Sequence, residues 1–294
     1  MHWTRRGLLA AGAVGLMAPT LARAYQVDAA LWEVRDRHAK VFLFGDGGPL
    51  RKPWRSTRIE AALAESAVFW KETPDNGPES APLLLSHGVD PAAPLSTWLT
   101  PKDHERLEAA ALATGIPSSA LERFRPWLAA VFLENSFNAR FGFKAANAPD
   151  ESLAAIAKAA GKPIRTEFPD MAALVAYASG FSRAAEVQSL LRLVDDVEAG
   201  PDVQQRRIEA WAVGDLSLEA CELQRWTRVY PDLVQEYVVA RNRRWPGRIR
   251  TMLDDGGTTF VVIGDGHLVG PDSVLVELAA AGMRAHPSHA GTAA

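Results

Sequence analysis

Two segments near opposite ends of the chain share one pattern, an apolar strand that runs directly into a Gly-Asp-Gly turn. The first is residues 41–48 (VFLFGDGG) and the second is residues 261–267 (VVIGDGH). Continuous apolar runs of this kind are typical of strands that are buried on both faces of a sheet. Because such strands must pair, the pattern predicts one sheet to which both ends of the 294-residue chain contribute.

The sequence around these segments extends the predicted sheet. Residues 31–34 and 41–44 are apolar runs separated by a charged stretch, which predicts a hairpin. Residues 67–70 follow a helical pattern at 58–67 and predict a further strand, and the clearest strand pattern is at 258–263. A last helix is expected after that strand, with a proline at position 271 in its first turn and a glycine at position 282 at its end.

The middle of the chain, from Pro101 to about Tyr237, is dominated by amphipathic helical patterns. Helices are expected at residues 102–113, 118–134, 151–160, 171–179 and 184–197. Residues 73–101 contain six prolines and several Gly and Ser residues, which predicts mostly connecting segments. The predicted fold class is therefore α/β, with a small central sheet built from both chain ends and a large helical middle segment.

Residues 1–24 predict an export signal of the twin-arginine type. Two arginines precede an apolar run at residues 8–18, and residues 22–24 (ARA) have the small-x-small form of a signal peptidase site. The apolar run covers 11 residues, about half of the roughly 20 that a membrane-spanning helix needs. We therefore expect a single domain at residues 25–294, exported to the bacterial periplasm without a stable membrane span.

Composition and cysteine usage narrow the chemistry. Lys and Arg number 32 against 35 Asp and Glu, and no stretch gathers basic residues, so nucleic acid is not an expected partner. Cys221 is the only cysteine, so a metal site would need His and carboxylate ligands. The glycines at 264, 266 and 270 lack the spacing of a dinucleotide-binding turn. No P-loop, Gly-x-Ser-x-Gly or His-Glu-x-x-His motif occurs.

Several motifs follow one another in a specific order in the second half of the chain. They are Trp211–Asp215 (WAVGD), Arg241–Trp245 (RNRRW), Val262–Gly270 (VIGDGHLVG) and Ala281–Gly282 (AG). This ordered set resembles the TraB/GumN family, which is related to the Tiki-type metalloproteases. The first half fits as well, through residues 31–34 before the strand at 41–45 and through Glu72 at the end of the next strand. The resemblance covers nearly the whole chain after the predicted signal.

The resemblance implies a site with two Gly-x-x-His elements and glutamates, which in the Tiki-type enzymes is the proposed metal-dependent peptidase site. The chain keeps the second element, which makes His267 the implied metal ligand, but Gly48 stands where the first histidine would be. Glu72 and Glu167 are the implied catalytic carboxylates. Either glutamate is alternatively a partner of Arg241, and Arg241 itself is a candidate for substrate contact or for a structural role.

Asp46 and Asp265 form a second candidate site, suggested by the residues rather than by the family. They occupy corresponding turns after the two strands, so neighbouring strands would bring the two carboxyl groups together. Such a pair either shares a proton or binds a hard divalent cation such as Mg, Mn or Ca. In the alternative interpretation each Asp bonds the backbone N–H groups of its own turn.

Three functional hypotheses follow. In the first, the chain is a metal-dependent hydrolase, peptidase-like and with a degenerate site, that acts on a peptide or small-molecule substrate through a divalent ion of unknown identity. In the second, it is a non-catalytic binding or structural module of the periplasm, a pseudoenzyme. In the third, it is a periplasmic haem or metal carrier.

Overall fold

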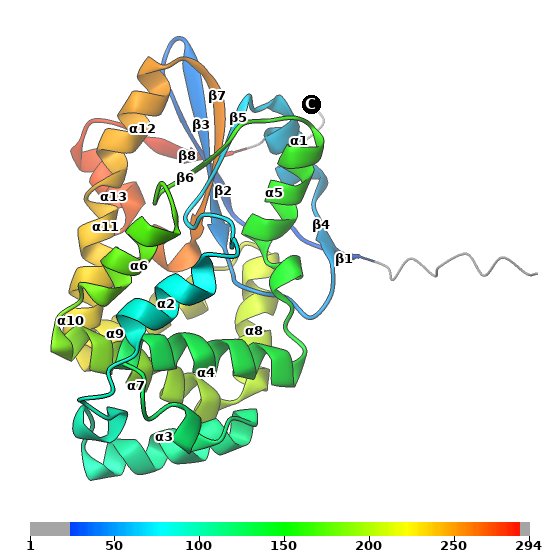
Figure 1. Cartoon of the computed structure of the whole chain (residues 1–294). Helices are drawn as coiled ribbons and strands as arrows, with labels where there is room; N and C mark the ends of the chain where they lie inside the picture. The colour runs from blue at the N-terminus through cyan, green and yellow to red at the C-terminus, as the bar shows by residue number, and fades with distance from the viewer. Residues whose placement is uncertain (1–23, 289–294) are drawn as a thin grey trace, which may run out of the picture.

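The computed structural model describes residues 24–288, and a mixed sheet of six strands forms its centre (Figure 1). The described residues form eight strands in all, six in this sheet and two in a separate pair. They are β1 (Tyr25–Gln26), β2 (Leu31–Arg35), β3 (Ala39–Asp46), β4 (Trp54–Arg55), β5 (Val68–Lys71), β6 (Ile164–Thr166), β7 (Gly257–Gly264) and β8 (Ala285–Pro287). The order in the sheet is β6-β5-β7-β3-β2-β8. The first four strands are parallel, and β2 is antiparallel to both of its neighbours. Strands β1 and β4 pair separately.

The two strands with the shared sequence pattern are neighbours at the centre of the sheet. Strands β3 and β7 pair in parallel, with Phe44 opposite Val262 and Asp46 opposite Gly264. Both strands are buried along almost their whole length, as their continuous apolar sequences predict. The prediction of an α/β fold with a small sheet built from both chain ends is therefore confirmed.

The helices fill the segment between β3 and β7 and the stretch after β7. They are α1 (Thr57–Glu65), α2 (Ser80–Gly88), α3 (Pro101–Thr114), α4 (Pro126–Phe141), α5 (Pro149–Ala159), α6 (Met171–Ser179), α7 (Arg183–Ala199), α8 (Pro201–Ala212), α9 (Ser217–Val229), α10 (Pro231–Leu233), α11 (Ala240–Asn242), α12 (Trp245–Asp254) and α13 (Val274–Ala280). Short 3-10 turns are η1 (Leu95–Thr97), η2 (Ser118–Ala120), η3 (Ala145–Asn147) and η5 (Asp265–Leu268), and η4 (Val234–Val239) is a π-helix. Local capping starts several helices: Thr100, Asp170 and Ser182 each accept a hydrogen bond from a backbone N–H three residues on.

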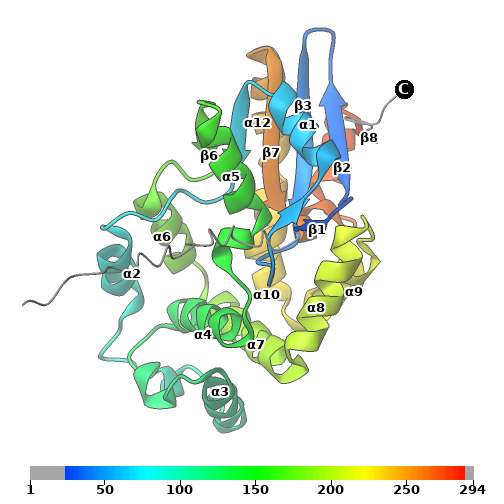
Figure 2. The same ribbon diagram turned by 90° about the vertical axis from the view of Figure 1, so that its right-hand side faces the viewer.

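Different helices cover the two faces of the sheet (Figure 2). Phe42 and Phe44 of β3 belong to the core formed with α1 and α5, whereas Val41 and Leu43 belong to the core formed with α12 and α13. Successive strand residues point to opposite faces, so one apolar run serves both cores. The remaining long helices form a separate helical half beyond the carboxyl ends of β3, β5 and β7 (Figure 1).

Two helices in the helical half differ from the sequence predictions. Residues 73–101 are mostly connection, as predicted, but they also contain α2, which was not predicted: Pro82 lies in its first turn, where a proline removes no helical hydrogen bond. The predicted helix at 118–134 instead begins at Pro126, after the separate turn η2. Proline is favoured at the first helical position, and here it sets the start of α4.

The start of the last helix also differs from the prediction. Ser273 caps α13, so the helix begins at Val274, and Pro271 precedes it rather than lying in its first turn. The predicted export signal falls, apart from Ala24, outside the described residues. Within residues 24–288, no helix is both long enough and apolar enough to cross a membrane.

Candidate functional site

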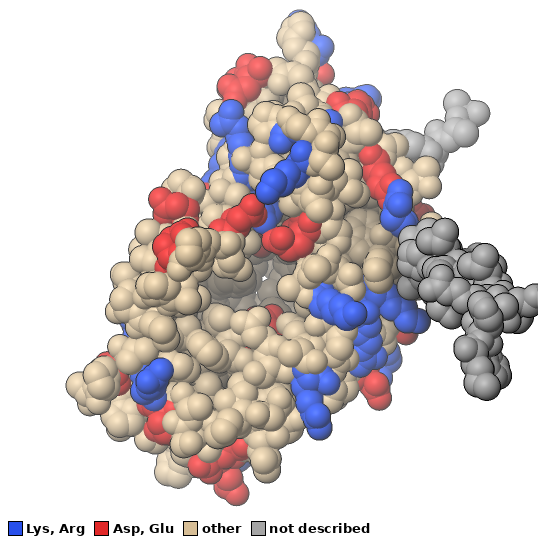
Figure 3. All heavy atoms as spheres, turned by 45° about the vertical axis from the view of Figure 1, so that its right-hand side comes forward, with Lys and Arg blue, Asp and Glu red and all other residues tan. Residues whose placement is uncertain are grey.

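A cavity of about 570 Å³ lies between the carboxyl edge of the sheet and the helical half. It opens to the surface as a hollow beside which acidic side chains gather (Figure 3). Asp46 at the end of β3, Glu72 after β5, and Gly264 and Asp265 at the end of β7 line it from the side of the sheet. The carboxyl edge of a parallel sheet is where α/β proteins place ligands.

The helical side of the cavity consists of residues at helical spacing. From α7 these are Ser189, Arg192, Leu193, Asp196 and Val197. Positions three, four and seven apart lie on one helix face, so a single face of α7 forms this wall. Parts of α4, α8, α9 and η4 contribute in the same way. None of these residues is among the site residues predicted from the sequence. Their shared helical spacing is the one sequence pattern that could have indicated them.

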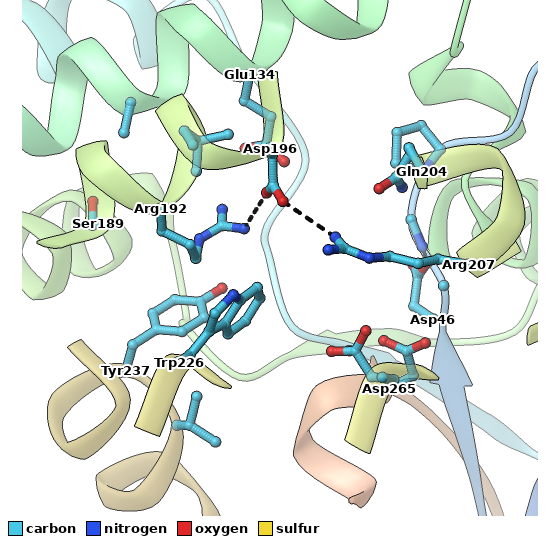
Figure 4. A pocket seen from close by; sticks show the side chains of 18 of the residues that line it. Asp46, Glu134, Ser189, Arg192, Asp196, Gln204, Arg207, Trp226, Tyr237 and Asp265 are labelled. Atoms are coloured by element: carbon cyan, nitrogen blue, oxygen red, sulfur yellow. Dashed lines mark hydrogen bonds and ion pairs between the residues drawn. The ribbon is translucent and has the colours of Figure 1, made fainter. Parts of the chain in front are cut away.

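The two guanidinium groups in the cavity are already paired. Arg192 and Arg207 both contact Asp196, at 2.7 Å and 3.2 Å, and they project into the cavity from α7 and α8 (Figure 4). Arg207 also lies 3.1 Å from a carboxylate oxygen of Glu222. The Arg192 guanidinium stands 4.7 Å from the centre of the Trp226 ring. These contacts hold both positive charges in place.

Asp46 and Asp265 meet at the floor of this cavity, as expected if their strands were neighbours (Figure 4). Asp46 accepts hydrogen bonds from the backbone N–H groups of Gly48 at 2.6 Å and Asp150 at 3.2 Å. Burial, and then the charge of Asp150, raise the pKa of Asp46 well above its usual value. Burial, and then the charges of Glu219 and Asp46, do the same for the pKa of Asp265.

Two further cavity carboxyls have raised pKa values because the surrounding cavity walls desolvate them, although Glu134 is an exposed residue and Glu219 is partly buried. They are Glu134 on α4 and Glu219 on α9, and within residues 24–288 neither has a hydrogen-bond or ion-pair partner. Nearby arginines lower both pKa values again without cancelling the effect of burial. A group of desolvated carboxyls in a cleft is a candidate functional site, because such groups gain or lose protons and bind cations readily.

A second cluster lies behind the sheet edge and is buried. Arg241 donates to Glu72 at 2.7 Å, to both carboxylate oxygens of Glu167, and to Nε2 of His267 at 3.0 Å. Arg241, Glu167 and His267 are 2%, 6% and 4% exposed, and of this cluster only Glu72 also lines the cavity. This is the alternative in which both glutamates pair with Arg241, and Arg241 itself does not line the cavity.

Both ring nitrogens of His267 are engaged within this cluster. Nδ1 lies 2.6 Å from the side-chain oxygen of Asn242, and Nε2 faces the Arg241 guanidinium. Because Arg241 only donates, Nε2 accepts and Nδ1 carries the proton. Burial, and then the charge of Arg241, lower the pKa of His267 to about 3, so the ring is neutral at physiological pH. Asn242 thus orients an imidazole whose remaining lone pair is already used.

These residues do not fit the metal that the family resemblance implies. A metal at His267 would have to displace Arg241 from Nε2 and would then face a buried positive charge. Within residues 24–288, no group of three or more His, Cys, Asp or Glu residues is placed to hold a metal ion. Both ring nitrogens of His267 are used in hydrogen bonds, so neither is free to bind a metal ion.

The two Gly-Asp-Gly turns are not equivalent in structure. The second continues as η5, whereas the first leaves the sheet as a loop in which Gly48 has φ +83°. A side chain on Gly47 would meet the Trp211 ring at 2.6 Å, and the Trp211 indole N–H donates to the Gly45 carbonyl at 2.8 Å. The first turn is therefore shaped by a tryptophan and by glycines, at the position where the family pattern has its first histidine.

The π-helix η4 separates the two clusters. Its residues Val234, Tyr237 and Val238 line the cavity. Helix α11 follows it directly and carries Arg241 and Asn242 of the buried cluster. π-helical turns are rare and occur frequently at functional sites, because they shift side chains relative to a regular helix. The irregular turn thus lets one continuous segment serve both the cavity and the buried network.

A comparison with protein-family models agrees with the family resemblance seen in the sequence motifs. The model of the TraB/PrgY/gumN family matches residues 30–287, nearly the whole chain. The chain therefore belongs to the TraB/PrgY/gumN family. No match is found among curated proteins or among solved structures.

The buried network generates a stability prediction. Replacing Arg241 by Met leaves the buried carboxylate of Glu167 with only the Arg248 guanidinium, 4.0 Å away, so we expect the free energy of unfolding to fall by about 3–5 kcal/mol. Urea denaturation followed by circular dichroism measures this. Arg243→Met is the matched control: its side chain is 59% exposed and 4.0 Å from Glu277, and we expect a change below about 1 kcal/mol. Similar losses in the two variants would contradict the prediction.

The raised pKa of Asp265 predicts a pH-dependent cost of folding. The folded protein holds this proton to higher pH than the unfolded chain, so the carboxyl destabilises the fold as pH rises above the unfolded pKa. We expect Asp265→Asn to raise the free energy of unfolding at pH 7.5 by about 1 kcal/mol, and by much less at pH 4. Urea denaturation at both pH values checks this, with exposed Asp254→Asn as the control. A gain that is equal at both pH values would argue against a desolvated carboxyl.

The two glycines of the first turn should respond differently to alanine. Gly47→Ala pushes a methyl group into the Trp211 ring, so we expect a loss of about 1–3 kcal/mol and altered tryptophan fluorescence. At Gly48 the nearest neighbour is 3.8 Å away, so Gly48→Ala should cost only the positive φ, about 1–2 kcal/mol, with unchanged fluorescence. Unchanged fluorescence in Gly47→Ala would show that the loop moves freely.

Proposed function

We propose that this protein is a binding member of the TraB/PrgY/gumN family, in which the cavity is the working site and the His267 cluster is structural. The observation that carries this is the state of His267: Asn242 and Arg241 occupy both of its ring nitrogens. A peptidase-type metal site needs a free imidazole lone pair and carboxylates free to act on water or metal. Here Arg241 holds both glutamates in ion pairs.

The cavity supports a binding role by its size and lining. Its volume of about 570 Å³ falls within the range of small-molecule sites, roughly 300–1,000 Å³. Aromatic and aliphatic side chains from α4, α7 and η4 form much of the wall, and polar groups project from the floor and from α8. Apolar walls with a few placed polar groups bind and orient small organic ligands or the ends of peptides.

Hydrolysis at the floor of the cavity is the second candidate function. Asp46 and Asp265 both lie at the cavity floor with raised pKa values, and general acid catalysis needs a carboxyl whose pKa is raised in this direction. In this hypothesis one carboxyl protonates the leaving group and the other orients a water molecule. Carboxylate oxygens also suit a hard divalent ion, which would compensate the same negative charges.

We further propose that the protein works in the bacterial periplasm after loss of residues 1–24. The support is the paired arginines, the short apolar run and the ARA sequence of residues 22–24. N-terminal sequencing of protein recovered from a periplasmic fraction is expected to start at Tyr25. Replacing Arg5 and Arg6 by Lys should leave the protein in the cytoplasm, and unchanged export would contradict a twin-arginine route.

Elemental mass spectrometry of exported protein, together with native mass spectrometry, tests the binding function. We expect no stoichiometric metal in the natural chain or in His267→Ala. We also expect a co-purified organic ligand, or an added one, to be held by the natural chain and lost from Ser189→Trp, in which the new ring fills space beside α7.

Other outcomes select between the candidates. A stoichiometric metal that His267→Ala loses would contradict the proposal and restore the family site. A metal kept by His267→Ala but lost from the double variant Asp46→Asn, Asp265→Asn would favour metal-assisted hydrolysis at the cavity floor. The exposed variant Glu105→Gln on α3 is the control for both measurements.

A further inference from the structure

We infer that the cavity binds a ligand that carries a cationic amine on an apolar body. This inference rests on the proposed binding function and deepens it by assigning the chemical class of the ligand. It depends on three features of the lining: an excess of carboxyl groups, the prior pairing of both arginines, and aromatic walls.

Carboxyl groups far outnumber positive groups around the cavity. Eight carboxyl side chains and two guanidinium groups line it. The carboxyl groups are Asp46, Glu72, Glu134, Asp150, Asp196, Asp215, Glu219 and Asp265, and the guanidinium groups are Arg192 and Arg207. They come from strands, helices and loops that are far apart in the sequence, so the excess belongs to the cavity and not to one acidic segment. Carboxyl oxygens accept hydrogen bonds from ammonium N–H groups, and a cation bound beside a carboxyl favours its ionised form, so this lining suits a ligand with a positive charge.

The arginines form their ion pairs with carboxylates other than Glu134 and Glu219, although their charges still act on both glutamates. Arg192 and Arg207 share Asp196, and Arg207 also contacts Glu222 outside the cavity lining. By contrast, Glu134 (Figure 4) and Glu219 have no hydrogen-bond or ion-pair partner within residues 24–288. An anionic ligand would thus meet guanidinium groups that already have carboxylate partners, whereas a cationic one would meet carboxyls that have none.

Aromatic rings complete the environment of a cation. Phe181, Trp211, Trp226 and Tyr237 line the cavity together with the carboxyls. Ammonium groups are attracted to the faces of such rings, and the attraction grows when the site is shielded from water. The contact of Arg192 with the Trp226 ring shows that this wall already holds one cation at 4.7 Å from the ring centre.

The apolar part of the lining indicates that the rest of the ligand is apolar. Ala130, Val131, Phe137, Leu193 and Val197 form a continuous apolar wall from α4 and α7. A small hydrophilic amine would leave this wall without a partner. An amine with an aromatic or aliphatic body, or a peptide end with a basic and an apolar side chain, fills both parts.

Three indoles of similar size but different charge test the inference. Tryptamine is cationic, tryptophol is neutral and indole-3-propionate is anionic, so charge is the main variable. We expect tryptamine to bind in isothermal titration calorimetry and to raise the melting temperature, with the other two at least about tenfold weaker. Glu219→Gln and Glu134→Gln should each weaken tryptamine binding about tenfold, and exposed Glu105→Gln should leave it unchanged.

The outcomes separate this inference from the proposed function. Equal or tighter binding of tryptophol or indole-3-propionate would overturn the cationic class and leave the cavity as a binding site. Tryptamine binding that Glu219→Gln, Glu134→Gln and Ser189→Trp leave unchanged would place the amine outside the cavity and overturn the inference. Failure of all three indoles, with no ligand retained by the natural chain, would contradict both the inference and the proposed function.

Discussion

The buried guanidinium of Arg241 is the interaction on which the rest of the site depends. It joins Glu72 after β5, Glu167 after β6, and His267 in η5, so three segments at one edge of the sheet share a single positive charge. Because burial of unpaired carboxylates is costly, Arg241 fixes where these segments can lie. Burial, together with the charge of Arg241, keeps His267 neutral, and Arg241 is also hydrogen-bonded to it. In the function that we propose, this cluster has a structural role beneath the cavity.

The cavity differs from this buried cluster in how its charged groups are paired. In the buried cluster each charge has a partner, whereas Glu134 and Glu219 in the cavity have none among the described residues. Desolvated carboxyls without partners destabilise a fold, and such a cost is typically retained where a ligand compensates it. This contrast in charge pairing is the reason why we propose a structural role for the buried cluster and a binding role for the cavity.

The sequence predicted the sheet better than the site. Strands β3 and β7 were predictable because residues 41–46 and 258–263 are continuous apolar runs, and their burial dominates any local preference. Helix α2 was missed because prolines usually mark loops, although Pro82 is harmless in a first turn. Asp46 and Asp265 were placed together correctly, since parallel neighbours end at the same edge.

The walls of the cavity could not be predicted in this way. Arg192 and Asp196 are separated by one helical turn, a pattern that equally describes a solvent-exposed face with its own ion pairs. Only the packing of α7 against α4 and beside the sheet edge turns that face inward. The pairing of Arg241 with both glutamates was foreseeable as one alternative. The hydrogen bonds that engage both ring nitrogens of His267 were not foreseeable, because they depend on Asn242 and on the π-helix η4 before it.

The loop with Gly48, where the resemblance places the first family histidine, has a geometry of its own. Gly48 has a positive φ, and Gly47 leaves no room for a side chain beside Trp211, so this loop has its own packing requirements. The same loop places Asp46 at the cavity floor, where its carboxyl accepts two backbone N–H bonds and faces Asp265. A neutral imidazole at this edge would offer a lone pair to a metal, whereas a carboxyl pair offers negative charge to any cation. The loop therefore brings a carboxyl group, and no imidazole, to this edge of the sheet.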